Sequence, residues 1–401
     1  MAAVVTCSIL LGLAGLLTPF LYERFGVLSL GYYNAPTRLP RHANFRSLEI
    51  RFADQIRNCE DVLLVESHQL ALLACDPGRE RWNTVMGIFQ PEGEGEANAN
   101  AGLYLYRYAD ASSPLRPVAL AGFDGELRTL GLELDEASST LYVVNHARAG
   151  SRLDLFHLDL AAATATWSRS IAHPLLHAPN SVALLGPGSL LVSNDHRFTA
   201  RSSPRLLWML ETYLGLATGT VVHVRERPDH DGPGPGLVVD AAVVARQPYP
   251  NGVAVLNATT VAVAATNKAA VYLYTLTPAG GGHRRHPVLS YRLAVPVPFL
   301  PDNLSVDGET GALLIAGHPH VASLTRWAAT RHLCHRPEAA ATDMCASQRT
   351  GSWVAEWSEA GGLRHIYAGT DFATACTAVR HRRVGLAVGL YERGLMVWQE
   401  E

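Results

Sequence analysis

Several signatures of common enzyme and nucleic-acid-binding folds are missing from this chain of 401 residues. It contains no GxSxG nucleophile elbow, which excludes an α/β-hydrolase, and neither a GxGxxG fingerprint nor a P-loop. No CxxC pair is present, so a zinc site is not expected. The formal net charge is −3 and no basic stripe occurs, so nucleic acid is not an expected partner.

Long stretches of helical periodicity are also scarce. Short runs of Val, Leu, Ala and Tyr are bounded by Gly, Pro, Asn and Asp instead, which is typical of an all-β protein. Hydrophobic residues make up 48% of the chain, enough for a sizeable core in one large domain or two ordinary ones.

The N-terminal segment, MAAVVTCSILLGLAGLLTPFLYERFG, carries no charge before Glu23. Its length is about that needed to cross a bilayer. We expect residues 1–25 to be a signal anchor with a single membrane span, or an uncleaved signal segment. The rest of the chain is then expected in the secretory pathway, either membrane-anchored or secreted. An N-terminal helix packed on the core is the alternative interpretation.

The cysteines are compatible with an oxidising compartment. Cys59 and Cys75 flank EDVLLVESHQLALLA and are placed to join the ends of two antiparallel strands, while Cys334 and Cys345 flank a polar loop. We expect two disulfides with this pairing. The triplet NAT at Asn257 is a glycosylation sequon and fits the same compartment.

One pattern recurs along the chain: an apolar strand, a turn, and a second apolar strand that ends in a polar or small residue. Six such units begin near residues 60, 130, 180, 251, 302 and 375. Several are followed by a third strand-like run, for which we include SLTRWAA at residues 323–329. Six equivalent hairpins predict an all-β, six-bladed β-propeller over residues 45–401. A sandwich or two barrels would not account for six hairpins. The segment near residues 204–217 interrupts the pattern and has the apolar spacing of a helix.

The start of each unit is expected to line the central channel of the propeller. In four of the six units this position carries a carboxylate or a carboxamide. Oxygen ligands that converge from several strands suit Ca²⁺, which accepts six to eight of them in loose geometry. The sequence therefore predicts a calcium site formed by Glu60, Asn180, Asn251, Asp302 and Asn303.

The second strand of each hairpin returns to the face where the first strand began. Asp195 and His196 end such a strand in SLLVSNDH, His146 ends another in LYVVNH, and His318 ends a third in LLIAGH. We expect these four candidate catalytic residues to lie near the metal. A cation that polarises a carbonyl, beside a histidine and carboxylate pair that draws a proton from water, is the equipment of a hydrolase.

The combination of NSVALLGPGSLLVSNDHRF with WMLETYLGLATGTVVHV, and the later YPNGVAV, PDNLSVD and GHPH, resembles the paraoxonase/arylesterase family. The resemblance runs from about residue 45 to the C-terminus. It implies a calcium-bound six-bladed propeller that hydrolyses lactones, aryl esters and sometimes organophosphates. It also implies that the N-terminal segment associates with membrane or lipid.

By this resemblance the ring from Glu60 to Asn303 holds the catalytic calcium, and Asp61 matches a ligand of a second, structural calcium. His146 matches the second histidine of the family's catalytic dyad. Asp195 and His196 match a pair near the site, and His318 matches a histidine of the active-site wall.

Two positions depart from the family pattern. Leu127, or Arg128–Thr129 with a small shift, stands where the first histidine of the dyad is expected, and Ser181 replaces an aspartate of the second calcium site. A catalytically impaired propeller that binds a ligand or partner is therefore the alternative function. A strictosidine-synthase-like propeller shares the architecture, but no specific residue supports it.

Overall fold

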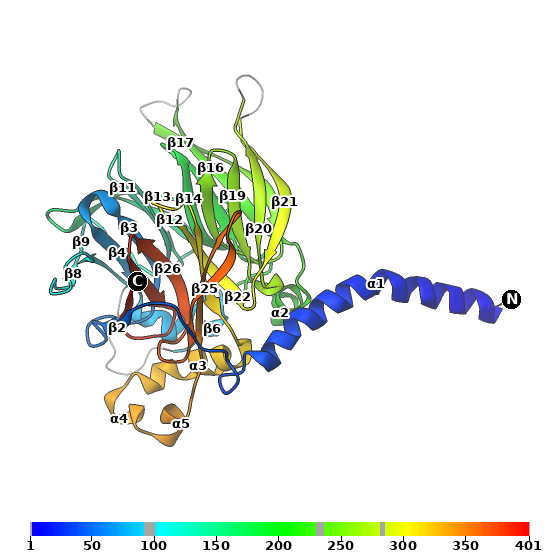
Figure 1. The fold of residues 1–401 in the computed structure, drawn as a ribbon. Helices are drawn as coiled ribbons and strands as arrows, with labels where there is room; N and C mark the ends of the chain where they lie inside the picture. Colours follow the sequence, from blue (N-terminus) through cyan, green and yellow to red (C-terminus); the bar gives the residue numbers. More distant parts are fainter. Residues whose placement is uncertain (1, 92–100, 230–235, 281–284, 401) are drawn as a thin grey trace.

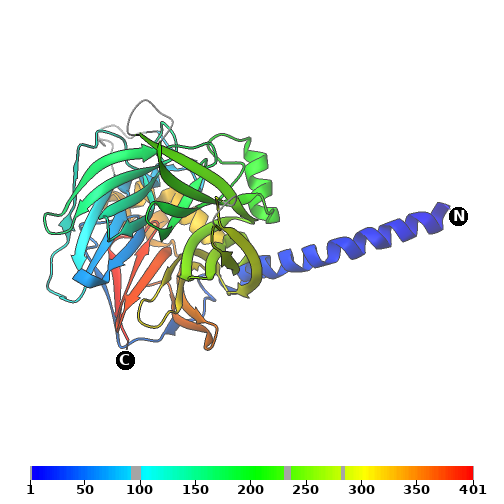
Figure 2. The same ribbon diagram turned by 90° about the horizontal axis from the view of Figure 1, so that it is seen from above.

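The structure is a computed structural model that describes residues 2–91, 101–229, 236–280 and 285–400. Six antiparallel sheets of four or five strands are arranged around a central channel, and the expected all-β six-bladed propeller is confirmed (Figures 1 and 2). In each sheet the first strand is the innermost, and the inner strands pack against one another in cyclic order.

The first three blades follow the chain order. Blade 1 contains β3 (Cys59–Val65), β4 (Leu70–Cys75), β7 (Gly102–Arg107) and β8 (Arg116–Pro117). Blade 2 contains β10 (Thr129–Asp135), β11 (Thr140–Asn145), β12 (Arg152–Asp159), β13 (Thr164–Ile171) and, paired in parallel at the edge, β9 (Ala119–Ala121). Blade 3 contains β14 (Pro179–Gly186), β15 (Ser189–Asn194), β16 (Gly219–Asp229) and β17 (Gly236–Gln247).

The last three blades include two strands from the N-terminal part of the chain. Blade 4 contains β18 (Pro250–Asn257), β19 (Thr260–Ala265), β20 (Ala270–Thr277) and β21 (Val288–Pro296). Blade 5 contains β22 (Leu300–Val306), β23 (Leu313–His318), β24 (Ser352–Ser358), β25 (Gly362–Gly369) and β1 (His42–Ala43). Blade 6 contains β26 (Ala375–His381), β27 (Val384–Gly389), β28 (Leu395–Gln399) and β2 (Ser47–Arg51).

Strand β2 closes the ring of blades. It pairs antiparallel with β28, with Ser47 opposite Gln399 and Arg51 opposite Leu395. The last blade thus takes its outer strand from the beginning of the propeller sequence, which ties the two ends of the fold together. Closure removes an exposed sheet edge that would otherwise be free to pair with another chain.

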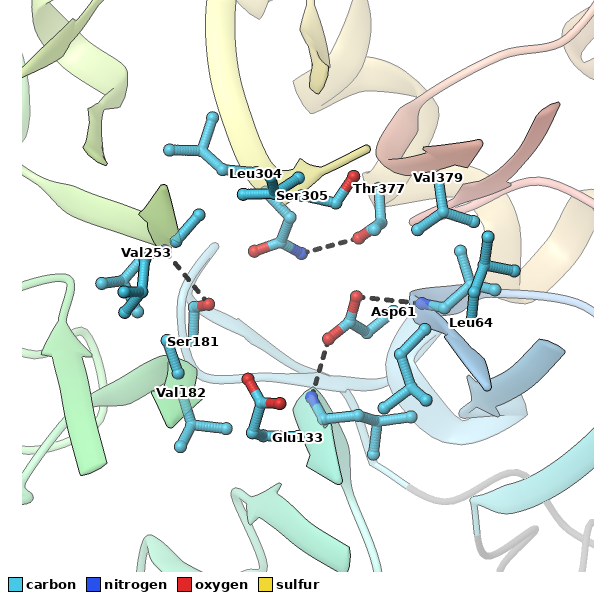
Figure 3. Close-up of a pocket in the computed structure, with 18 of the residues that line it drawn as sticks. Asp61, Leu64, Glu133, Ser181, Val182, Val253, Leu304, Ser305, Thr377 and Val379 are labelled. Carbon is cyan, nitrogen blue, oxygen red and sulfur yellow. Dashed lines mark hydrogen bonds between the residues drawn. The ribbon is translucent and has the colours of Figure 1, made fainter. Parts of the chain in front are cut away.

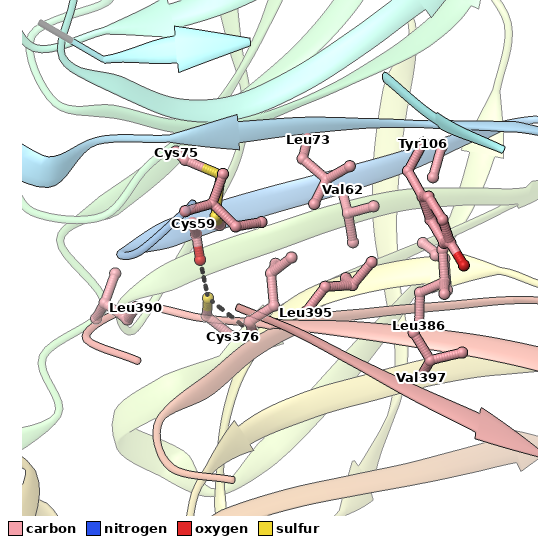
Figure 4. Close-up of a cluster of buried hydrophobic side chains, with 14 of the residues drawn as sticks. Cys59, Val62, Leu73, Cys75, Tyr106, Cys376, Leu386, Leu390, Leu395 and Val397 are labelled. Atoms are coloured by element: carbon pink, nitrogen blue, oxygen red, sulfur yellow. Dashed lines mark hydrogen bonds between the residues drawn. A yellow bond between two sulfur atoms is a disulfide. The ribbon is translucent and has the colours of Figure 1, made fainter. Parts of the chain in front are cut away.

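The hydrophobic core is divided among the spaces between neighbouring blades. Between blades 6 and 1, Val62, Leu73, Tyr106 and Leu386 pack together beside the cysteines of β3 and β4 (Figure 4). Both expected disulfides are present, Cys59–Cys75 and Cys334–Cys345. The first disulfide joins β3 to β4 and, with the interblade clusters, holds the inner strands around the channel, whereas the second joins two helical segments outside the blades.

Helical segments lie at the face of the propeller where the inner strands begin. The predicted helical excursion is α2 (Arg205–Leu214), between β15 and β16, and it ends where Gly215 adopts a φ of +64°. The prediction of a strand at residues 323–329 is wrong, because this stretch lies within helix α3 (Val321–Cys334). Two short helices, α4 (Pro337–Ala340) and α5 (Asp343–Ala346), follow it.

Five short elements complete the described secondary structure. The hairpin of β5 (Trp82–Asn83) and β6 (Ile88–Phe89) lies between β4 and β7, preceded by the 3₁₀ turn η2 (Pro77–Glu80). The 3₁₀ turns η1 (Glu66–His68) and η3 (Thr266–Lys268) connect strands within blades 1 and 4.

Helix α1 (Ala2–Tyr33) projects away from the propeller (Figures 1 and 2). Its C-terminal part is attached to the blades: Glu23 forms an ion pair with Lys268, and Asn34 donates a hydrogen bond to the carbonyl of Pro298. The Arg24 side chain packs against Gly215 at the end of α2. In the part of the chain that is described, no helix meets the length and hydropathy required to cross a membrane.

Candidate functional site

A β-bulge occurs at the same position in all six inner strands. The register between first and second strand shifts between Cys59 and Asp61 in blade 1, and at the matching place in the other five blades. A bulge re-aims the side chains beside it, which lets consecutive residues approach the channel. The predicted ligands all lie at these bulges.

Two blades have glycine at a bulge because the neighbouring inner strand approaches closely. A Cβ atom at Gly131 would lie 2.8 Å from the carbonyl oxygen of Asn180, and one at Gly252 would lie 2.5 Å from the amide nitrogen of Leu304. Blade 2, with Leu130 and Gly131 at its bulge, contributes backbone there instead of an oxygen-bearing side chain.

The five predicted ligands of the first calcium site are buried at this level of the channel. As whole residues, Glu60, Asn180, Asn251, Asp302 and Asn303 are each at most 6% exposed. The carboxamide nitrogen of Asn303 donates to Glu60 Oε1 over 3.2 Å, which joins blade 5 to blade 1. Burial raises the pKa of Glu60 well above its ordinary value, and the neighbouring Asp61 and Asp302 raise it further against the effect of Arg79.

Four of these five side chains have a buried oxygen with no hydrogen-bond partner among the described residues. The atoms are Oε2 of Glu60 and the Oδ1 atoms of Asn180, Asn251 and Asn303. An unsatisfied buried oxygen costs about 1–3 kcal/mol, so four in one ring need a compensating ligand. A hard cation would satisfy all four, and the donor set of two carboxylates and three carboxamides fits Ca²⁺.

The ring differs in composition from sites built on charged or imidazole ligands. In the described ranges, no group of three or more His, Cys, Asp or Glu side chains is placed to hold a metal ion. Neutral carboxamide oxygens form the majority of the ring, and these are ordinary ligands of calcium.

The side chains of Asp61 and Ser181 accept hydrogen bonds from backbone groups of the inner strands. The two carboxylate oxygens of Asp61 accept hydrogen bonds from the backbone N–H groups of Val62, at 2.9 Å, and Leu132, at 2.7 Å. The hydroxyl of Ser181 accepts one from the backbone of Val253. Both residues line a cavity of about 320 Å³ along the inner strands (Figure 3). Burial raises the pKa of Asp61 to about 7. The structure thus places Asp61 towards this cavity, with its oxygens already engaged.

His318 forms a pair with Asp302. Its Nε2 atom lies 2.8 Å from Asp302 Oδ2, and because a carboxylate accepts, Nε2 donates. The other nitrogen, Nδ1, is buried and has no hydrogen-bond partner among the described residues. In the neutral ring this nitrogen carries the lone pair. The pair therefore presents an oriented imidazole with an open acceptor beside the ring of oxygens.

His146 has both ring nitrogens engaged. Nε2 lies 2.5 Å from the carbonyl oxygen of Pro179 and must donate to it, while Nδ1 faces the hydroxyl of Thr84. Burial lowers the pKa of His146 below its ordinary value. Its backbone carbonyl also accepts a hydrogen bond from the indole of Trp82. These contacts hold His146 in one orientation between blades 2 and 3.

Asp195 is bonded to His196 and Asn180. Its Oδ1 accepts from His196 Nδ1 over 2.7 Å, and its Oδ2 accepts from Asn180 Nδ2 over 3.3 Å. His196 Nε2 lies 2.8 Å from the hydroxyl of Thr212 on α2, so the helix holds this ring. Asp195 and His196 thus form a pair that orients a ring carboxamide.

The residues that stand where the family pattern has its first dyad histidine are buried or ion-paired within the fold. Leu127 is buried in the hydrophobic cluster between blades 1 and 2. Arg128 forms ion pairs with Asp76 and Glu126, each at 3.0 Å. Thr129 begins β10 and is fully buried. No imidazole is available in this stretch.

Three site residues were missed by sequence reasoning. Arg79 on η2 and Thr84 beside β5 reach the site from the connection between β4 and β7, which has no repeat pattern. Tyr249, which precedes the bulge of β18, places its ring 4.4 Å from that of His196. Tyr249 is the first residue of the quoted motif YPNGVAV, two residues before the predicted ligand Asn251, and this place was the available signal.

The described residues thus form a six-bladed propeller with buried, unpartnered oxygens in its channel and an oriented histidine beside them. The family model described as Arylesterase matches residues 128–331, just over half of the chain. The chain belongs to the arylesterase family.

Individual relatives agree with this assignment. Serum paraoxonase/arylesterase 1 of Mus musculus is 31% identical over 189 residues, 45% of each chain. Serum paraoxonase/lactonase 3 of Homo sapiens is 26% identical over 215 residues, 51% of this chain and 53% of the relative. The chain thus spans about half the length of the curated relatives it matches.

A solved structure supports the fold. A gluconolactonase from Xanthomonas campestris superimposes with a TM-score of 0.50 at 15% identity, covering 89% of this chain and 91% of that one. At this identity the likeness concerns the architecture alone. Together, the family match supports an ester or lactone hydrolase at the level of the family.

Proposed function

We propose that the chain is a calcium-dependent hydrolase of carboxylic esters and lactones. The observation that carries the proposal is the set of four unpartnered oxygens from Glu60, Asn180, Asn251 and Asn303. They converge from four blades, and the donor chemistry fits Ca²⁺. Calcium bound there would polarise the substrate carbonyl and stabilise the oxyanion that forms on it.

The residues of the chain have distinct proposed tasks in this reaction. Asp302 orients His318, and the open Nδ1 of His318 takes a proton from the attacking water. Asp195 and His196 hold the carboxamide of Asn180 in the ring. His146 shapes the wall through Pro179 and Thr84, and burial of all these groups limits competing water.

Turnover of phenyl acetate and of a neutral lactone tests this proposal. Activity is expected in calcium, absent in EGTA and restored by added calcium. His318→Gln should lower kcat by about 10²–10⁴-fold, the usual contribution of a general base. His146→Gln, which keeps a donor at a similar position, should have a smaller effect. Turnover that persists in EGTA or in Asp302→Ala would refute the mechanism.

A binding protein on the same scaffold is the second candidate. The specific observation in its favour is Leu127, a core residue where the family pattern has a histidine. This candidate predicts a chain that binds calcium but turns over neither substrate, and Thr129→His should then raise the activity. Rapid turnover by the unaltered chain would rule it out.

We also propose a place in the secretory pathway and association with a lipid surface. The two disulfides support an oxidising compartment, and Asn257 of the sequon is exposed at the end of β18. Apolar side chains are exposed on the described part of α1 and on α2, which meet at Gly215. A surface of this kind commonly marks a binding site for protein or membrane.

A further inference from the structure

A buried arginine lies beside the ring of oxygens. Arg79 is on η2, a turn that is capped by the side chain of Asp76. Its guanidinium is 2% exposed and donates through Nη2 to the backbone carbonyl of Thr129. Thr129 begins the inner strand of blade 2, in the stretch Leu127–Thr129 where the family pattern places a histidine. The cation of Arg79 therefore occupies the neighbourhood of the missing imidazole.

The hydrogen-bonding capacity of these two residues is not used up. Among the described residues, Arg79 forms no ion pair, its Nε–H is buried without a partner, and the hydroxyl of Thr129 is buried without a partner as well. A guanidinium without a carboxylate is costly in a protein interior. Arg79 and Thr129 are joined by a hydrogen bond, and within the described ranges each has a buried donor without a partner. Two such donors side by side indicate a missing acceptor.

The charge of Arg79 acts on the proposed catalytic ring. Among the charges around Glu60, it is the strongest that opposes the effect of burial on the pKa of this carboxyl, and it adds to the lowering of the pKa of His146. Asp195 is already engaged with His196. Calcium in the ring would balance the two carboxylates of Glu60 and Asp302, and Arg79 adds one positive charge beside them, with the carboxylate of Asp76 also within its electrostatic reach.

We propose that Arg79 and Thr129 form an anion subsite next to the calcium, which makes esters and lactones bearing a carboxylate the preferred substrates. This inference rests on the proposed function for the reaction and adds the substrate class. Arg79 provides the charge and a planar donor edge, and the Thr129 hydroxyl donates a further bond. Arginine suits such recognition because its donors match the oxygens of a carboxylate.

Two esters that differ by one group test the inference: 4-acetoxybenzoate, which carries a carboxylate, and 4-methylphenyl acetate, which carries a methyl group in its place. In Arg79→Met, kcat/KM for the anionic ester should fall at least ten-fold more than for the neutral ester. Arg79→Lys should recover part of the loss, and Thr129→Val should show a smaller selective loss. Arg81→Met is the matched control, because Arg81 follows on the same segment and is partly exposed, and it should leave the ratio unchanged.

Binding of benzoate, followed by calorimetry with and without calcium, separates this inference from the proposed function. The unaltered chain should bind benzoate but not benzamide, and Arg79→Met should weaken binding at least ten-fold. Arg79→Met should also bind calcium several-fold more tightly, because a nearby positive charge is removed.

If neither ester is hydrolysed but benzoate binding depends on Arg79, the subsite stands and the proposed reaction fails. Equal losses for both esters, or benzoate binding that ignores Arg79, would overturn the subsite. If Arg79→Met does not fold, Arg79→Lys and Thr129→Val decide by the same ratio.

Discussion

The histidines at the mouth of the channel differ in which of their ring nitrogens are hydrogen-bonded. His318 has one nitrogen on Asp302 and one open nitrogen, whereas His146 has both nitrogens engaged. His196 lies between a carboxylate and the Thr212 hydroxyl. These three histidines lie at the ends of equivalent strands, but among the described residues only His318 of the three has a nitrogen open to accept a proton from water. The hydrogen-bond partners of each ring make this difference.

A histidine remote from the site is expected to govern part of the pH dependence of stability. The His223 ring in blade 3 is packed against His286, with the two Nδ1 atoms 2.8 Å apart, and against Ser189, with Arg225 and Asp240 nearby. Burial, together with the neighbouring His286, lowers the pKa of His223 to about 4.

The folded state therefore resists protonation of His223 where the unfolded chain accepts it. Stability should be full above about pH 6.5, fall as the pH drops from there towards 4, and level off below, by at most about 3 kcal/mol. Urea unfolding at a series of pH values measures this. His223→Gln should flatten that part of the curve. An unchanged slope in the variant would show that His223 does not contribute.

The residue positions that sequence alone could predict were those tied to the repeat. Glu60, Asn180, Asn251 and Asp302 were found because equivalent hairpins place their first residues on one ring. Arg79 could not be found, because it comes from a connection of irregular length and its role depends on the absence of a partner. The pairing of Asp195 with His196 depends on side-chain rotamers, which strand periodicity does not determine.

At the scale of elements, the repeat predicted strands better than helices. All six inner strands were expected at their positions, because alternating apolar runs and turn residues specify hairpins. Helix α3 was missed because SLTRWAA is short and was assigned to the third strand-like run of its unit, although Leu324, Trp327 and Ala328 have the i, i+3, i+4 spacing of a helix. Its N-cap is His320, whose Nδ1 accepts from the backbone of Ser323, and histidine is not a usual helix-start signal.

The exposed apolar faces of α1 and α2 predict binding to lipid. Leu17, Leu21 and Leu28 on α1 are 51% to 69% exposed and cannot stabilise the propeller by burial. Co-sedimentation with phosphatidylcholine vesicles should capture the full chain. Replacing these three leucines with serine should lower the bound fraction several-fold. Trp167→Ser, a change at a 39% exposed aromatic on the outer strand of blade 2, is the control and should bind normally. Equal binding of all three proteins would contradict this role of α1.

At the scale of the whole molecule, closure and function depend on the same strands. β2 completes blade 6 from the N-terminal side, so the ring of inner strands is held at both ends of the sequence. The closure by β2 was not foreseen, because a five-residue strand with one partly buried leucine gives little pattern. The inner strands all have a bulge at one level, and four of them place side-chain oxygens there. Gly131 and Gly252 allow neighbouring inner strands to approach closely at this level.

The central claim is that this ring binds calcium and that the bound ion supports ester and lactone hydrolysis. The most direct measurement follows lactone turnover during a titration of the metal-free chain with Ca²⁺, with bound calcium determined in the same samples. The account predicts turnover that rises in proportion to the filling of one site, and loss of both binding and turnover in Asp302→Ala. Turnover without bound calcium, or a filled site in Asp302→Ala with unchanged turnover, would contradict it.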